Sequence, residues 1–243
     1  MRLSYQQIED IASATMRDFN AFFFGESEEA NSIHATPIDQ FASQYLKLDV
    51  KIERLCADES ICGITAYSNT TLITEINGVK VPIPMKQNQV LLDIHFMQPG
   101  NIQKLCGKRR FTLAHECAHQ LLYQLESDET KADCRKMYSN KKGYTARELK
   151  TKEDWNEWQA NALGAAIILP KREVCRVADY MTRGNKIKST FGQLDFFGNM
   201  VVGEISDIFH ASASAVKIRL ERLGYIEDCT EELVDLRREE ALA

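Results

Sequence analysis

The segment His115-Glu116-Cys117-Ala118-His119 constrains this chain more than any other, because it reads H-E-x-x-H within a stretch whose apolar residues recur at helical spacing. Histidines four residues apart project from one face of a helix, so both imidazoles can reach a single metal ion. A zinc ion held in this way lowers the pKa of its water to about 7, and the intervening glutamate can accept the water's proton. The pattern therefore predicts His115 and His119 as zinc ligands and Glu116 as the general base.

A catalytic zinc ion usually takes three protein ligands and leaves its fourth position to water, so one ligand is missing from the motif. Glu157 is the candidate, on a helix that the sequence predicts from about Thr151 to Pro170. On the same helix, the small Gly164 would allow a close approach to the histidine helix, and Asn161 is placed to hydrogen-bond a ligand imidazole. Several other acids follow the motif, and H-E-x-x-H also arises by chance. Spacing alone therefore leaves open a solvated surface role for Glu157.

Two segments, RRFTLAHECAHQLLY (109–123) and EWQANALGAAIILP (157–170), resemble the ImmA/IrrE family of zinc metallo-endopeptidases. Members show an R-F-T-x-A-H-E-x-x-H helix, then E-x-x-A-N with small residues and an apolar end closed by proline. The resemblance implies His115, His119 and Glu157 as zinc ligands, Glu116 as catalytic base and a transcriptional repressor of the helix-turn-helix type as the protein substrate. Two features depart from the family: the stretch between the segments is longer than in compact members, and Leu169 replaces a frequent methionine.

Ahead of the motif, the sequence predicts two helices and several short strands. The helices are expected over Tyr5–Phe24 and from Pro37 to about Leu46. The strands are expected over Cys62–Tyr67, Thr71–Ile76, Val79–Met85 and Val90–Phe96. Asn77-Gly78 is a two-residue hairpin signal, and because of the two prolines at 82 and 84 their strand is expected to lie at an edge or to be irregular. An extended peptide can pair with such an edge as one more strand.

The order of these elements predicts an α+β protein with two domains. Residues 1–182 are expected to form a small zincin-like metallopeptidase domain, in which helices pack on a short, mostly antiparallel sheet. Residues 183–243 are expected to form a helical C-terminal extension. Within it, Val202–Phe209 and Ala213–Leu223 are joined at 210–212 and resemble a helix-turn-helix.

The charge of this extension argues against a DNA-reading role. Over residues 201–226 three basic residues are balanced by three acidic ones: Lys217, Arg219 and Arg222 against Glu204, Asp207 and Glu221. A DNA reader normally concentrates positive charge on one face. We therefore expect this unit to pack against the rest of the chain or to dock a protein, with DNA binding disfavoured.

The composition fits a cytoplasmic globular protein. Of the 243 residues, 44% are hydrophobic and 27% are charged, and the net charge of −5 argues against bulk electrostatic binding to nucleic acid. The seven cysteines are odd in number and lack C-x-x-C spacing, which favours reduced thiols over a disulfide framework. No stretch has the apolar length of a signal peptide or a membrane span, so no membrane partner is expected. The oligomeric state does not follow from the sequence.

Several further residues have two interpretations. Tyr67, Tyr123 and His95 are possible electrophilic helpers beside the metal, although ordinary packing is the expected role for each. Cys117 is turned away from His115 by helix geometry and should be a buried thiol. The basic segment 127–153 is expected to be a solvated surface, with a flap that attracts an acidic partner as the alternative.

Two functions from different classes follow. One is a zinc-dependent endopeptidase that cuts an intracellular protein, with water activated by Glu116. The other is a non-proteolytic regulator that keeps the zinc fold and acts by binding a repressor or DNA. A binding protein has no need of a base beside its metal, so Glu116 favours the peptidase.

Overall fold

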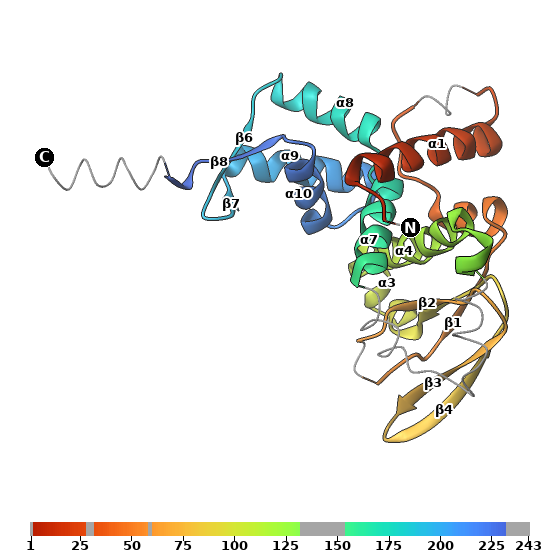
Figure 1. The fold of residues 1–243 in the computed structure, drawn as a ribbon. Helices are drawn as coiled ribbons and strands as arrows, with labels where there is room; N and C mark the ends of the chain where they lie inside the picture. The colour runs from red at the N-terminus through yellow and green to blue at the C-terminus, as the bar shows by residue number, and fades with distance from the viewer. Residues whose placement is uncertain (1, 28–31, 58–59, 132–153, 232–243) are drawn as a thin grey trace, which may run out of the picture. The chain divides into compact units, whose positions relative to one another are not determined.

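A computed structural model describes residues 2–27, 32–57, 60–131 and 154–231 (Figure 1). The chain divides into two compact units, Met1–Ser32 with Thr36–Ile168, and Ile33–Ala35 with Leu169–Ala243. Helices and strands both contribute to the first unit, so the chain is a mixed α+β protein, as the sequence predicts. No helix in the described ranges combines the length and the apolar character needed to cross a membrane.

The first unit begins with α1 (Tyr5–Phe24), which has the predicted bounds. Ser4 and Gln7 form a capping box at its start, and its apolar stripe is buried. After Pro37 the chain forms a short helix, α2 (Ile38–Gln40), which continues as a π-helical segment, η2 (Phe41–Tyr45). The predicted helix after Pro37 is therefore present, but its second half is wound more loosely than an α-helix.

A three-stranded sheet in the order β1-β5-β2 lies at the centre of the first unit. Its strands are β1 (Asp49–Glu53), β2 (Gly63–Thr65) and β5 (Gln89–Asp93). β2 runs antiparallel to β5, whereas β1 runs parallel to it, so the sheet is mixed. The sequence predicted β2 and β5 but missed β1, because β1 has only five residues and three of them are charged. β2 lies at an edge of this sheet.

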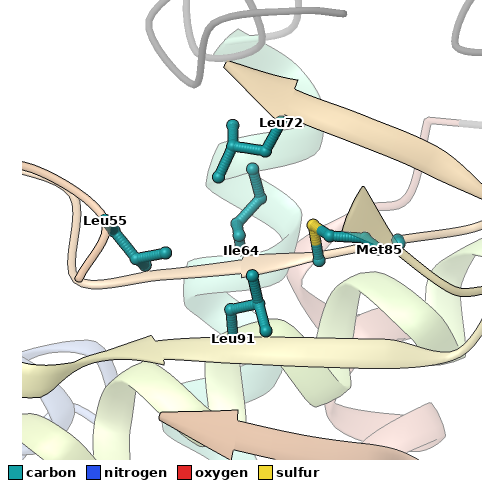
Figure 2. Close-up of a cluster of buried hydrophobic side chains, with 6 residues drawn as sticks. Leu55, Ile64, Leu72, Met85 and Leu91 are labelled. Carbon is teal, nitrogen blue, oxygen red and sulfur yellow. The ribbon is translucent and has the colours of Figure 1, made fainter. Parts of the chain in front are cut away.

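A hairpin of β3 (Thr70–Ile76) and β4 (Val79–Met85) forms a separate two-stranded sheet. Its turn residues, Asn77 and Gly78, both have positive φ (54° and 78°), which is the backbone that the Asn-Gly signal predicts. The proline-bearing strand β4 pairs only with β3 among the described strands, so its predicted edge position is confirmed. Figure 2 shows how the hairpin packs on the central sheet through a buried apolar cluster that includes Leu55, Ile64, Leu72, Met85 and Leu91.

The helices that carry the motif follow the sheet. β5 ends at Asp93, earlier than predicted, because the Asp93 side chain accepts a hydrogen bond from the His95 N–H and starts a 3₁₀ turn, η3 (Ile94–Met97). A short helix, α3 (Asn101–Lys104), leads into α4 (Cys106–Leu125). The last helix of the first unit is α7 (Asp154–Ile168). The basic segment predicted as a flap or a solvated surface lies almost wholly outside the described residues.

The described residues of the second unit form three helices and a small sheet. The helices are α8 (Lys171–Thr182), α9 (Phe196–Phe209) and α10 (Ala213–Arg222). The strands are β6 (Ile187–Thr190), β7 (Gln193–Leu194) and β8 (Ile226–Asp228), in the order β7-β6-β8. This sheet was not predicted, because two to four residues are too few to show a period. The predicted domain boundary at residue 182 would place α8 with the first domain, whereas the structure groups it with the second unit.

The two helical segments predicted for residues 202–223 are present as α9 and α10, joined where the sequence predicts. His210 ends α9 in the left-handed conformation (φ 49°), and the Ser212 hydroxyl caps α10 by accepting from the Ala215 N–H. α9 begins earlier than predicted, at Phe196, because the Asp195 carboxylate accepts a 2.6 Å hydrogen bond from the Gly198 N–H and caps it there.

Candidate metal centre

α4 presents two neighbouring faces to the rest of the first unit. Thr112, Glu116 and Gln120 follow one another at four-residue intervals, and this face lies against β2. The buried Gln120 amide donates to Thr65 Oγ1 (2.7 Å) and to the Ala66 carbonyl (3.1 Å), which fixes the end of the strand on the helix. The second face carries the two motif histidines and faces α7. α4 therefore holds the sheet with one face and the predicted ligands with the other.

The approach of α7 to α4 depends on Gly164. A Cβ at this position would lie only 3.0 Å from the backbone nitrogen of His115 and 3.1 Å from its Cα. Any larger residue would push the helices apart, so the predicted role of Gly164 is confirmed. Glu157 lies two helical turns before Gly164 and shares its face, which brings the carboxylate to the histidine pair.

Three ligand atoms converge between the two helices. His115 Nε2 and His119 Nε2 are 3.0 Å apart. Glu157 Oε2 lies 3.3 Å from His115 Nε2, and Glu157 Oε1 lies 3.4 Å from His119 Nε2. Within the described part of the chain, this is the one group of three His, Cys, Asp or Glu side chains whose ligand atoms all lie within 4.8 Å of one another.

The charges at this centre favour a cation. Burial by itself lowers the pKa of His115, but the hydrogen bond to Glu157 and the negative charges of Glu116 and Glu157 outweigh it, so the pKa of His115 is raised. Burial by itself raises the pKa of Glu157, but the hydrogen bonds and charges of His115 and His119 hold it well below its usual range. The carboxylate is thus ionised over the whole physiological range, and positive charge is stabilised beside it.

Asn161 lies on the centre's side of α7, one turn after Glu157. It is close enough to His115 to contribute to the raised pKa of that imidazole. The buried Nδ1 of His115, however, has no hydrogen-bond partner of ordinary geometry among the described residues. That Asn161 orients a ligand imidazole therefore stays a prediction.

Glu116 is buried beneath the edge strand, next to the two histidines. A Cβ on Gly63 of β2 would lie 3.0 Å from Glu116 Oε1 and 2.7 Å from Thr112 Cγ2, so only glycine allows the strand to pass this close. Sequence reasoning did not single out Gly63 or Gln120. For Gln120, the four-residue spacing from Glu116 was the available signal. For Gly63, none was available, because the contact is between residues far apart in the chain.

The other side chains considered from the sequence, which are Cys117, His95, Tyr67 and Tyr123, lie in different surroundings. Cys117 is completely buried, and burial raises the pKa of its thiol, so it is a packing residue as predicted. His95 is also buried, with its Nδ1 2.8 Å from Asp93 Oδ1, and it is not part of the group of converging ligand atoms. Tyr67 and Tyr123 are partly exposed and stack on each other.

The fold and the centre together define a mixed α+β protein in which two histidines and a glutamate from two crossing helices converge beside a buried acid. Neither the known protein families nor the curated proteins include a match to this chain.

Proposed function

We propose that this chain is a zinc-dependent endopeptidase of the H-E-x-x-H type, similar to the ImmA/IrrE family, and that it cuts an intracellular protein. The convergence of His115, His119 and Glu157 beside the buried Glu116 is the observation that carries the proposal. A zincin-like arrangement of the first unit and a cytoplasmic location belong to the same proposal.

The donor set fits zinc better than the other common biological cations. Two imidazole nitrogens and one carboxylate oxygen are the ligands of many catalytic zinc sites, whereas calcium and magnesium prefer oxygen alone. The two imidazole nitrogens lie 3.0 Å apart, so they can share one cation, either a proton or a metal ion. His115, His119 and Glu157 would hold the ion, and bound zinc would supply Lewis acidity that makes water a nucleophile near neutral pH.

Glu116 is placed for proton transfer. Its carboxylate lies on the face of α4 that contacts β2, and its negative charge contributes to the raised pKa of His115. In the proposed reaction Glu116 accepts the proton of the attacking water and then delivers it to the leaving amine. Burial beneath Gly63 limits the access of bulk water to this carboxylate, which keeps its orientation fixed.

The substrate is proposed to bind as an additional strand on β2. Ala66 donates to the Gln89 carbonyl, and Asp93 donates to the Cys62 carbonyl, so residues 62, 64 and 66 hydrogen-bond toward β5. The N–H and C=O groups of Gly63 and Thr65 therefore point to the other side, where no described strand pairs with them. A peptide paired there would lie next to the part of β2 that covers Glu116. The family resemblance suggests a helix-turn-helix repressor as this substrate.

The substitution Glu116→Gln tests the proposal against the alternative of a regulator that only binds. It keeps the side-chain size but removes the base, so cleavage should fall by about 10²–10⁴-fold while zinc content and melting temperature stay unchanged. The measurement is cleavage of a helix-turn-helix repressor, the proposed substrate class, followed by gel electrophoresis, with zinc determined by mass spectrometry. Glu75→Gln, an exposed acid on β3, is the matched control and should cleave normally. Full activity of Glu116→Gln would favour the binding regulator.

A further inference from the structure

We propose that the stacked rings of Tyr67 and Tyr123 form an aromatic platform that selects a large apolar or aromatic side chain in the substrate, two or three residues before the scissile bond. This inference rests on the proposed peptidase function and adds a specificity determinant to it. It assigns a role to two residues that take no part in holding the metal or moving the proton.

The position of Tyr123 on α4 places it beside the centre. Phe111, His115, His119 and Tyr123 recur every four residues, so they form one stripe along the face of α4 that carries the ligands. Tyr123 is one turn beyond His119, which corresponds to about 6 Å along the helix axis. On this stripe, Tyr123 is the next side chain after the ligand pair toward the C-terminal end of α4.

Tyr67 reaches Tyr123 from the edge strand that is proposed to bind the substrate. It follows the end of β2 by two residues, and its ring centroid lies 4.4 Å from that of Tyr123 at an angle of 19° between the rings. The backbone at this point is fixed by Gln120, whose buried amide donates to Thr65 Oγ1 and to the Ala66 carbonyl. The platform is therefore built from α4 and from the end of β2, the strand proposed to bind the substrate, and its position is set by buried hydrogen bonds.

The two rings combine apolar surface with partial exposure. A ring pair that served only the core would be fully covered, as Phe19 and Phe41 are in this chain. Tyr67 and Tyr123 instead keep part of their surface in solvent at the end of the edge strand. Aromatic surface of this kind gains free energy when an apolar side chain covers it, and an aromatic side chain gains more by stacking.

The direction of the substrate follows from the pairing of strands. β2 passes Glu116 at Gly63 and runs toward Tyr67, so a peptide paired antiparallel to β2 passes the platform before it reaches Glu116. The residue over the platform then lies on the N-terminal side of the scissile bond. Tyr123 lies seven residues beyond Glu116, or about 10 Å along α4, which corresponds to about three residues of an extended chain.

Zinc-chelating peptides provide a test that does not require turnover. The probes are the N-acetyl tripeptide hydroxamate of three alanines and its three variants with one phenylalanine, and their binding to the zinc-loaded full chain is measured by calorimetry. The peptide with phenylalanine in the second position from the hydroxamate, or the one with phenylalanine in the third, should bind about tenfold more tightly than the alanine peptide. The peptide with phenylalanine next to the hydroxamate should bind no more tightly than the alanine peptide. Tyr67→Ala and Tyr123→Ala should each remove this gain and leave the affinity for the alanine peptide unchanged. Tyr67→Phe and Tyr123→Phe should retain it.

Tyr180→Ala, which removes an exposed tyrosine from α8, is the control and should behave as the wild type. Equal binding of all four peptides, or a gain that survives in both alanine variants, would overturn the platform while the peptidase proposal stands. Loss of the affinity gain in the Tyr67→Phe and Tyr123→Phe proteins would mean that the tyrosine hydroxyl groups provide the gain, and this would also overturn the platform. A wild-type chain that binds zinc poorly and no hydroxamate would instead contradict the proposed function, and this inference with it.

Discussion

Two helix pairs of this molecule, α4–α7 and α9–α10, contain polar side chains that are partly or fully buried, and the partners of these side chains differ. In the first unit, α4 and α7 bring His115, His119 and Glu157 together so that their ligand atoms face one another. In the second unit, α10 buries Arg219, whose Nε donates a 2.9 Å hydrogen bond to the Leu169 carbonyl. The ligand atoms of the first group converge on a point where a cation would fit. The second group is one guanidinium, Arg219, which forms a hydrogen bond with the protein backbone.

The difference shows how a functional polar cluster is told from a structural one. A buried polar group is normally satisfied by a hydrogen bond to its own protein, as Arg219 is. His115, His119 and Glu157 are instead paired with one another, and a metal ion that replaced their shared protons could bind the same nitrogen and oxygen atoms. The comparison also bears on the second unit as a DNA reader. Arg219 is buried and Lys217 donates to the Gly192 carbonyl, so these two basic side chains of residues 201–226 already have protein partners.

The largest expected effect is on zinc affinity in Glu157→Ala. Removing one of three protein ligands should weaken zinc binding by more than the roughly 10–100-fold that is typical for residues behind the ligands. The measurement is competition with a zinc-sensing chelator. Asp154→Ala, at the start of the same helix, is the control and should bind zinc normally. Unchanged zinc affinity in Glu157→Ala would mean that the carboxylate is a surface group and that the contrast between the two helix pairs fails.

Arg219→Ala should lower the free energy of unfolding of the second unit by about 2–4 kcal/mol. The substitution leaves the Leu169 carbonyl without this donor and removes a buried side chain. Urea unfolding followed by circular dichroism measures the change. Arg222→Ala, on the exposed side of the same helix, should change the stability by less than about 0.5 kcal/mol. Equal effects of the two substitutions would contradict a structural role for Arg219.

Gly164→Ala should separate α4 from α7 and so act on stability and on the metal centre together. The new Cβ would meet the His115 backbone at 3.0 Å, and overpacking of this kind costs about 1–3 kcal/mol. We expect weaker zinc binding as well, because the shift moves Glu157 away from the histidines. Gly203→Ala in α9, where a Cβ meets nothing within 4 Å, is the control. Normal zinc affinity in Gly164→Ala would show that the centre tolerates a wider helix separation.

The smallest expected effect concerns DNA. Reversing Lys217 and Arg222 to Glu should leave binding to duplex DNA negligible, as in the wild type, because a balanced surface charge does not attract phosphates. Arg219 is left unchanged in this variant, since its reversal would place an acid in the core. Fluorescence anisotropy with a labelled duplex at several salt concentrations measures the affinity. Tight, salt-sensitive binding by the wild type that the double reversal abolishes would make the second unit a DNA reader.

The sequence by itself determined the features that depend on local spacing. The four-residue interval placed both histidines on one helical face, Asn77-Gly78 set the hairpin turn, and Gly164 marked the close helix contact. Each follows from the geometry of a single element, which a short stretch of sequence encodes. Glu157 was the preferred third ligand, but spacing alone did not separate it from other acids.

Only the tertiary structure decided the features that depend on residues far apart in the chain. It brought Glu157 within 3.4 Å of both histidines, set Gly63 over Glu116 and stacked Tyr67 on Tyr123. It also paired β1 with β5 and buried Arg219, neither of which a local pattern indicated. These contacts depend on how the elements pack. The sequence around a residue does not specify which distant residues it will contact.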